Sequence, residues 1–237
     1  MNKIKSEQKD INKQIEFLVE KIFINIPIDI EITINMIYQG QQEILLELII
    51  KRLLKNKKSA DTLDGFIFQK LLNSNIIATK NKLNKYFPDG VARLKKSLHI
   101  NYQPLQKLLM NQNFQEADRL TNKYLCQLVE IKTKNSKKWL YFTDIQFLPL
   151  EDLFTLDLLW KIYSRGKFGF SIQKQIWTKN NKNWDKLWEK IGWTYNGTMK
   201  RYPKEFEWTL NAPEGHLPLS NQLRGTKTLL YLFNYIK

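Results

Sequence analysis

Three neighbouring carboxylates, Glu151, Asp152 and Asp157, are the side chains that come closest to an acid–base pair in the sequence. Catalysis by paired carboxyls needs two groups in different environments, with a nucleophile or a metal site beside them. The surrounding sequence predicts a helix on which these residues face solvent, and no nucleophile or metal-ligand motif accompanies them. We therefore expect solvated carboxylates and a protein that is not an enzyme.

A basic segment with two glycines, Arg165 to Ser171, has the composition of a phosphate-binding loop but not its spacing. A P-loop requires G-x-x-x-x-G-K-[ST] and a dinucleotide fold requires G-x-G-x-x-G, and neither pattern is present. The segment instead predicts a tight turn that delivers Phe168 and Phe170 into a core.

Metal ligands are scarce, since the chain has two histidines, His99 and His216, and one cysteine, Cys126. A single cysteine excludes an intramolecular disulfide and a cysteine metal cluster. His216 stands alone in a segment with glycine and proline, and His99 lies in a presumed linker between domains. We expect loop histidines bonded to the backbone and no metal held by the protein.

A basic and aromatic segment points to a different class of function. Trp139, Tyr141 and Phe142 follow a group of lysines, a combination used by single-stranded nucleic-acid binders. The lysines are Lys132, Lys134, Lys137 and Lys138. RRM, zinc-finger and helix-turn-helix patterns are absent. We favour a solvated loop before a buried aromatic segment, and keep a basic single-stranded RNA-binding protein as the alternative function.

The net charge of +15 over 237 residues favours an anionic partner: nucleic acid, acidic protein, lipid headgroups or a small molecule with carboxylates. Apolar residues make up 43%, as in a folded globular protein. No run of about 18 apolar residues is present. The N-terminal MNKIKSEQKDINKQ has neither signal-peptide nor transit-peptide character, so we expect the protein to remain in the compartment where it is made.

The two halves of the chain differ in the residues available for a core. All seven tryptophans follow residue 138, whereas the first hundred residues are rich in Ile and Leu. Turn-forming residues at 86–90 and 101–104 separate the halves. The sequence therefore predicts an N-terminal unit, 1–103, and a C-terminal unit, 104–237.

Helical periodicity dominates the N-terminal unit. Helices are expected at 3–23, 41–55, 61–72 and 75–86, the last two with Asp61 and Asn75 as N-caps. The isoleucines from Ile22 to Ile34 alternate with the period of a strand. Pro27 and the lack of a partner strand favour a short helix after Asp29 instead.

The C-terminal unit has the same character. Pro104 fits the first turn of a helix, longer helices are expected at 114–130 and 150–163, and Cys126 falls inside the first of these. From Ser164 onward, frequent Gly, Pro and Asn predict loops and short helices.

Consecutive segments between residues 139 and 225 resemble the genomes-uncoupled family of porphyrin-binding proteins. They are WLYFTDI, PLEDLFTLDLLWKIYSRGKFGFSIQKQIW, KLWEKIGW, RYPKEFEWTL and NAPEGHLPLSNQLRG. Upstream, PLQKLLMNQNFQEADRLT is similar to the family's first core helices, so the resemblance covers roughly 104–227. FGFSIQ together with APEGHLP is its most specific pair.

The resemblance implies an all-α fold with a small N-terminal helical bundle or superhelix and a multihelical C-terminal core shaped like a cupped hand. Family members are not catalytic and require no cofactor. They bind protoporphyrin IX and magnesium-protoporphyrin IX, and stimulate the magnesium chelatase of chlorophyll biosynthesis through its large porphyrin-binding subunit. We expect a monomer that does not bind nucleic acid, and peripheral membrane association stays open.

The family's cleft residues carry over by position to seven residues of this chain: Phe142, Ile145, Tyr202, Phe206, Asn221, Arg224 and Lys227. Aromatic walls suit the apolar faces of a macrocycle, and Arg224 and Lys227 suit its propionates. Asn221 offers an oxygen to a central magnesium. Tyr202 and Lys227 stand where relatives can carry tryptophan and arginine.

The compartment follows from context. An excess of Ile, Asn and Lys is typical of an AT-rich genome, and the chlorophyll pathway operates in photosynthetic cells. We expect the protein in a plastid, in the chloroplast stroma, with a cyanobacterial cytoplasm as the alternative.

Overall fold

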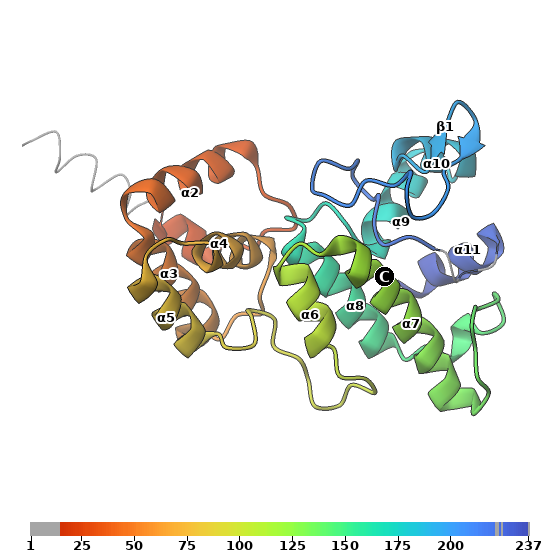
Figure 1. Ribbon diagram of the computed structural model, residues 1–237, viewed down its shortest axis with the longest axis horizontal. Helices are drawn as coiled ribbons and strands as arrows, with labels where there is room; N and C mark the ends of the chain where they lie inside the picture. Colours follow the sequence, from red (N-terminus) through yellow and green to blue (C-terminus); the bar gives the residue numbers. More distant parts are fainter. Residues whose placement is uncertain (1–14, 221–222, 224, 237) are drawn as a thin grey trace, which may run out of the picture. The chain divides into compact units, whose positions relative to one another are not determined.

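The computed structural model describes residues 15–220, 223 and 225–236 (Figure 1). These residues form helices and loops together with one short antiparallel hairpin, in which β1 (Thr194–Tyr195) pairs with β2 (Thr198–Met199). The predicted all-α fold is confirmed. Two compact units are present, Met1–Arg93 and Leu94–Lys237. Every helix in the described ranges is too short or too polar to cross a membrane.

The first unit is an array of short helices. Of the helix predicted at 3–23, residues 15–20 are helical, residues 21–23 are not, and residues 3–14 lie outside the described residues. The elements that follow are α2 (Ile28–Gly40), α3 (Gln42–Ile50), a π-turn η1 (Lys51–Lys55), α4 (Thr62–Leu72) and α5 (Ile77–Tyr86). Helix α3 packs against α4 and α5, and its apolar face forms much of the unit's core.

Of the alternating isoleucines, those from Ile28 to Ile34 lie in helix α2 rather than in a strand, in line with the helix predicted after Asp29, and Ile22 to Ile26 precede it in non-helical chain. Ile34 and Ile37 are buried, whereas Ile28 and Ile32 are exposed on the other face. Isoleucine occupies both faces of this helix, so its alternation in the sequence does not reflect the burial of one face.

A buried ionic network joins the elements of the first unit. Arg52 lies inside η1 with no exposed surface, 2.6 Å from a carboxylate oxygen of Asp61 and 2.6 Å from one of Asp64. It also donates to the Lys21 carbonyl at 2.8 Å. Asp61 is the N-cap of α4 in a reciprocal capping box with Asp64, as the sequence predicted for Asp61.

The predicted cap at Asn75 is wrong. Helix α5 begins at Ile77 with Ile76 in the cap position and no side-chain cap bond. The hydroxyl of Ser74 accepts from the Ile76 amide at 2.9 Å instead, so the short polar side chain that orders this turn is one residue earlier than expected.

The second unit contains α6 (Gln103–Met110), α7 (Phe114–Thr133), η2 (Ile145–Phe147), α8 (Leu150–Tyr163), α9 (Phe170–Lys179), α10 (Trp184–Lys190) and α11 (Thr226–Tyr235). Pro104 lies in the first turn of α6 and Cys126 in α7, as expected. Phe168 and Phe170 have no exposed surface, which confirms the predicted turn into the core. The predicted helix at 150–163 is confirmed at both ends.

Residues 94–102, which the sequence assigned to the first unit, are bonded to α8. Asp152 accepts from the His99 amide and the Tyr102 hydroxyl, each at 3.0 Å, and its second oxygen lies 2.8 Å from the His99 ring. The prediction that His99 bonds to the backbone is wrong, because its ring contacts the Asp152 carboxylate. The structural division at 93/94 precedes the predicted boundary because this segment packs with α8.

The prediction that Asp152 and Asp157 are solvated is wrong, because both are buried. Asp157 accepts from the Ser171 amide at 2.8 Å and pairs with Lys161 at 2.9 Å. Both carboxylates thus tie α8 to distant segments. Their partners are structural, and they offer no acid–base pair.

Indole rings follow one another along α9, α10 and the turn after it. Ring centroids are 5.0 Å apart for Trp177 and Trp184, 5.3 Å for Trp184 and Trp188, and 5.2 Å for Trp188 and Trp193. The centroid of the Phe233 ring of α11 lies 5.7 Å from that of Trp177 and 6.0 Å from that of Trp184. We call these four indoles the tryptophan array, and they form the packing between α9, α10 and α11.

Candidate functional site

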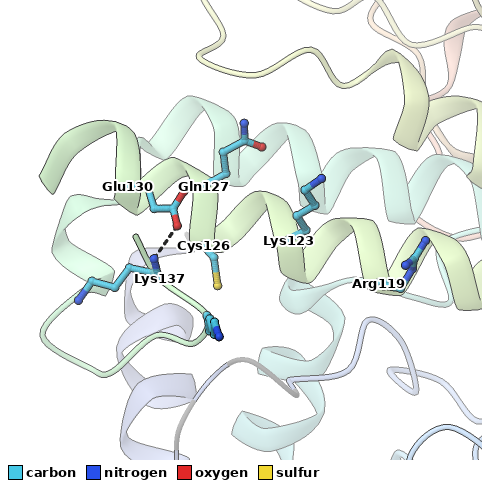
Figure 2. A pocket seen from close by; sticks show the side chains of 7 residues that line it. Arg119, Lys123, Cys126, Gln127, Glu130 and Lys137 are labelled. Carbon is cyan, nitrogen blue, oxygen red and sulfur yellow. Dashed lines mark hydrogen bonds between the residues drawn. The ribbon is translucent and has the colours of Figure 1, made fainter. Parts of the chain in front are cut away.

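A concave pocket of about 450 Å³ lies along helix α7 and is called the α7 pocket here (Figure 2). This volume falls in the range of small-molecule sites, about 300–1,000 Å³. Its lining side chains are Arg119, Lys123, Cys126, Gln127, Glu130, Lys137 and Lys138. Four are cations and one is a carboxylate, but Arg119 also pairs with Glu116 and Lys137 with Asp144, so the pocket has a modest excess of positive charge that favours an anionic ligand.

The sequence builds this pocket with one helix face and the loop that follows the helix. Arg119, Lys123 and Gln127 recur every four residues and so share one face of α7. Glu130 holds the loop, because its carboxylate accepts from the Lys137 amide at 2.5 Å and from the Ser136 hydroxyl at 3.0 Å (Figure 2). The pocket wall is therefore fixed at two points.

Cys126 is the buried residue of the pocket and is not a nucleophile. Burial raises the pKa of its thiol to about 11, with further contributions from the charges of Glu130 and Asp144. At neutral pH the thiol stays protonated, whereas nucleophiles and metal ligands are thiolates. Its role here is to fill space.

Phe142, Ile145 and Lys227 lie close together beside the pocket and form the first aromatic cluster with Tyr231. The Lys227 ammonium lies 3.9 Å from the centre of the Phe142 ring, and Phe142 packs on Tyr231 at 5.3 Å. Ile145 has no exposed surface and belongs to η2, which packs against α7 and α11. Asp144 links this cluster to the pocket through an ion pair with Lys137 at 3.0 Å.

Tyr202 and Phe206 belong to a second aromatic cluster with Trp208. The ring centroids lie 6.0 Å and 6.3 Å from that of Trp208, and the Trp208 indole donates to the Pro203 carbonyl at 3.0 Å. Tyr202 is 44% exposed. Burial raises its pKa, with smaller contributions from the charges of Asp118 and Glu116.

The segment after His216 is tied to the helices around it. The Leu217 carbonyl accepts from the Gly169 amide at 2.9 Å, the Pro218 carbonyl accepts from the Gln173 side chain at 2.7 Å, and Leu223 forms a parallel bridge with Leu140. Two predicted site residues of this segment, Asn221 and Arg224, lie outside the described residues, so their roles stay predictions.

Asp118 fixes the same segment from α7. One oxygen accepts from the Leu219 amide at 2.6 Å, and the other has no hydrogen-bond partner among the described residues. The side chain is fully buried, and burial raises its pKa to about 8, against the lowering effects of the Leu219 hydrogen bond and of the neighbouring Asn122 side chain, whose amide donates to the Asp118 backbone carbonyl at 3.0 Å. This carboxyl is mainly protonated at neutral pH.

A protein-family model described as GUN4-like matches residues 95–235, the greater part of the chain. The chain belongs to the GUN4-like family. The ycf53 protein of Porphyra purpurea is 45% identical over 191 residues, 81% of this chain and 80% of that one. The "Tetrapyrrole-binding protein, chloroplastic" of Arabidopsis thaliana is 36% identical over 139 residues, 54% of this chain and 51% of that one.

A solved structure supports the same assignment. The structure of GUN4 from Chlamydomonas reinhardtii has a TM-score of 0.53 and 36% identity, and the match covers 60% of this chain and 93% of that one. The resemblance that the sequence showed to the genomes-uncoupled family is therefore confirmed. The GUN4-like match contains the α7 pocket and both aromatic clusters.

The histidine of the GUN4-like segment APEGHLP bonds to the backbone, as expected. The His216 ring accepts from the Glu207 amide at 3.2 Å, so its other nitrogen, Nδ1, donates to the Ile191 carbonyl at 2.6 Å. Burial lowers its pKa, which keeps the ring neutral. The described residues contain no group of three or more His, Cys, Asp or Glu side chains that could hold a metal.

Sequence reasoning missed Arg119 and Lys123 of the GUN4-like core. The available signal was a polar stripe on α7 at every fourth residue, opposite the apolar face.

The expectation of a buried aromatic segment after Lys138 was wrong in part, because Trp139 and Tyr141 are 40% and 50% exposed while Leu140 between them is buried. The two exposed rings bond to each other, Trp139 Nε1 donating to the Tyr141 hydroxyl at 3.1 Å.

Proposed function

We propose that this GUN4-like protein binds protoporphyrin IX and magnesium-protoporphyrin IX along α7 in the second unit, and catalyses no reaction on them. The observation that carries the proposal is the cationic α7 pocket. Its Lys137 pairs with Asp144, which follows Phe142 of the first aromatic cluster by two residues. A chloroplastic relative named for tetrapyrrole binding supports it.

The chemistry of the ligand matches these surfaces. A macrocycle has two apolar faces, and each 100 Å² buried contributes on the order of 2.5 kcal/mol before ordering costs. Phe142, Tyr202 and Phe206 serve as walls, and Ile145 is the buried residue of η2. The cations around the pocket would donate hydrogen bonds to the propionates. Hydrogen bonds to charged groups contribute roughly 1.5–3 kcal/mol each.

A titration of the full chain with protoporphyrin IX tests this function. We expect a shifted Soret band together with tryptophan quenching. Absence of both, in a sample whose circular dichroism is helical, would refute the proposal. The alternative of RNA binding is tested with a single-stranded oligonucleotide, whose affinity would fall steeply with salt; we expect no such binding.

Arg224 and Asn221 are proposed to divide the recognition of the ligand. Arg224→Ala removes a charge-assisted bond to a propionate, so it should weaken every free-acid porphyrin and affect the diester less. Asn221→Ala removes an oxygen offered to magnesium and should mainly weaken the magnesium form. Equal loss with acid and diester would remove the propionate role from Arg224.

The biological role that follows is stimulation of magnesium chelatase through its large porphyrin-binding subunit, by a monomeric regulator in a plastid or a cyanobacterial cytoplasm. Relatives in Porphyra, Synechocystis and a chloroplast support this compartment. Adding the protein to purified chelatase with protoporphyrin and Mg²⁺ should increase the rate of magnesium insertion. An unchanged rate, with porphyrin still bound, would separate binding from stimulation.

A further inference from the structure

The first unit carries a concave surface unrelated to the α7 pocket. A groove of about 480 Å³ lies between α3 with its π-turn η1 on one side and the end of α5 on the other. Leu46 and Ile50, four residues apart, are its apolar residues on α3, and Tyr86, 43% exposed, is the aromatic one on α5. We call this surface the α3–α5 groove.

The charges around the groove are unbalanced. Glu43 and Lys82 pair with each other across it, which raises the pKa of Lys82. Three further lysines line it, Lys51, Lys55 and Lys85, and none of them makes an ion pair with another described residue. Against these three stands one remaining carboxylate, Glu47. The groove therefore offers Ile50 and Tyr86 as accessible apolar surface above the buried Leu46, with an excess of positive charge around them.

The backbone that presents two of these lysines is rigid. Arg52, between Lys51 and Lys55, turns inward and is held by the carboxylates of Asp61 and Asp64. With Arg52 locked inside the unit, its neighbours in η1 project from a fixed turn, and both are exposed. A fixed array of charges beside an apolar strip is typical of a recognition surface.

We propose that the α3–α5 groove binds an acidic amphipathic helix of a partner protein. A groove between two helices accepts a third helix whose apolar residues recur at i, i+3 and i+4. Carboxylates on the flanks of that helix complement Lys51, Lys55 and Lys85. Strand addition is not available, because the described residues of the first unit contain no strand with a free edge.

The partner helix has a defined length. The α3–η1 side spans residues 42–55, which at about 1.5 Å per residue is roughly 21 Å, or a helix of about 14 residues. A nucleic acid is a poorer fit, because Glu43 and Glu47 stand at the groove and its apolar strip has no counterpart in a phosphate backbone. The proposal does not depend on tetrapyrrole binding.

Fluorescence anisotropy on the full chain tests the proposal with a labelled synthetic helix of about 14 residues that has a leucine stripe and glutamate flanks. A scrambled peptide of the same composition and a lysine-flanked version serve as probe controls. We expect only the acidic amphipathic helix to bind. Equal binding of the scrambled peptide would overturn the proposal.

A pair of variants with the same change in charge separates the groove from the general field. Lys51→Glu/Lys55→Glu should lower the affinity for the acidic peptide at least tenfold. Lys57→Glu/Lys80→Glu, at exposed positions outside the groove, should change that affinity less than twofold. Equal losses would assign the effect to net charge and refute the site. Helical far-UV circular dichroism and an unchanged urea unfolding transition followed by that signal check that the first unit of each variant is folded.

A second copy of the chain is the competing occupant, because α2 is itself an exposed helix with Asp29 and Glu31 in its first turn. Sedimentation equilibrium distinguishes the cases. A dimer that Lys51→Glu/Lys55→Glu dissociates would assign the groove to self-association and overturn the proposal. A monomer that binds the acidic helix supports it.

Discussion

Asp61 and Asp64 in the first unit and Asp118 in the second are buried carboxylates in opposite surroundings. Asp61 and Asp64 share the buried guanidinium of Arg52. Asp118 accepts from the Leu219 amide, and among the described residues no ion pair joins it to a cation. A buried ion pair holds its unit together, because removal of either partner leaves the other charge buried without compensation. An unpaired carboxyl is neutral when buried, and its ionisation is coupled to the folding of the unit that contains it.

The pKa values express the same difference. Burial raises the pKa of Asp64 to about 6, against the lowering effect of Arg52. Burial raises the pKa of Asp118 to about 8, with only hydrogen bonds opposing it. The cation thus keeps Asp64 ionised at neutral pH, whereas Asp118 retains its proton.

The largest expected effect comes from removing the shared cation. Arg52→Met leaves two buried carboxylates without a partner and should destabilise the first unit by about 3–5 kcal/mol. Because every tryptophan lies in the second unit, urea unfolding of the first unit should appear in far-UV circular dichroism without a change in tryptophan fluorescence.

A matched lysine provides the control for Arg52. Lys58 also donates to backbone carbonyls of the N-terminal segment, at 2.8 Å to Val19 and 2.7 Å to Glu20, but it is partly exposed. Lys58→Met should cost less than about 1 kcal/mol. Equal effects of the two variants would show that the buried network has no special importance.

Asp118 should make the stability of the second unit depend on pH. Its folded pKa lies above the ordinary value near 4, so between about pH 4 and pH 8 the folded state holds a proton that the unfolded state has lost. Stability then falls as pH rises through this window, by up to about 1.4 kcal/mol per pH unit. Urea unfolding followed by tryptophan fluorescence at several pH values measures this slope.

Asp118→Asn tests the source of the slope while keeping an oxygen that can accept from the Leu219 amide. The variant should lose most of the pH dependence between pH 5 and pH 8 and keep porphyrin affinity close to that of the parent. If the slope of stability against pH were unchanged in this variant, other ionisable groups would have to account for the pH dependence.

Phe206→Ala sharpens the comparison on the ligand side. An aromatic wall touches the macrocycle and not its centre, so metal-free and magnesium protoporphyrin should both bind about tenfold more weakly, or about 1.4 kcal/mol. Phe154→Ala, an exposed aromatic residue of α8, should leave affinity within twofold. A loss confined to the magnesium form would place Phe206 near an axial position instead.

Lys227 should give the smallest effect on stability. Lys227→Met removes the cation from the Phe142 ring and keeps the aliphatic stem, so the free protein should change by about 0.5–1 kcal/mol. Free-acid porphyrin should bind a few-fold more weakly and the diester almost normally. Lys227→Arg should keep both the stability of the free protein and the affinity for free-acid porphyrin close to those of the parent. If it did not, the charge of Lys227 would not be what matters.

Local patterns predicted the helices well. The apolar spacing of α8 and the Asp61 cap of α4 were readable because each depends on residues a few positions apart. The burial of Asp152 and Asp157 was not readable, because Tyr102 lies 50 residues and Ser171 lies 14 residues from the carboxylate that it contacts. Charged residues on a helix appear solvated until their distant partners are known.

The candidate site was predicted by resemblance more than by physical pattern. Family motifs led to Phe142, Lys227, Tyr202 and Phe206, and the structure groups these residues in two clusters. The cations of the α7 pocket and the α3–α5 groove were missed, since lysine and arginine are abundant in this chain. Only the folded surface shows which cations border a cavity.

The tryptophan array also has a consequence for spectroscopy. Indoles about 5 Å apart exchange excitation among themselves before they emit, so Trp177, Trp184, Trp188 and Trp193 behave as one coupled emitter. An energy acceptor close to any one of these indoles therefore quenches the emission of all four. Quenching by a bound porphyrin should therefore exceed what the distance to each single indole implies, whereas Trp139, Trp160 and Trp208, which lie outside the array, would each report a local distance.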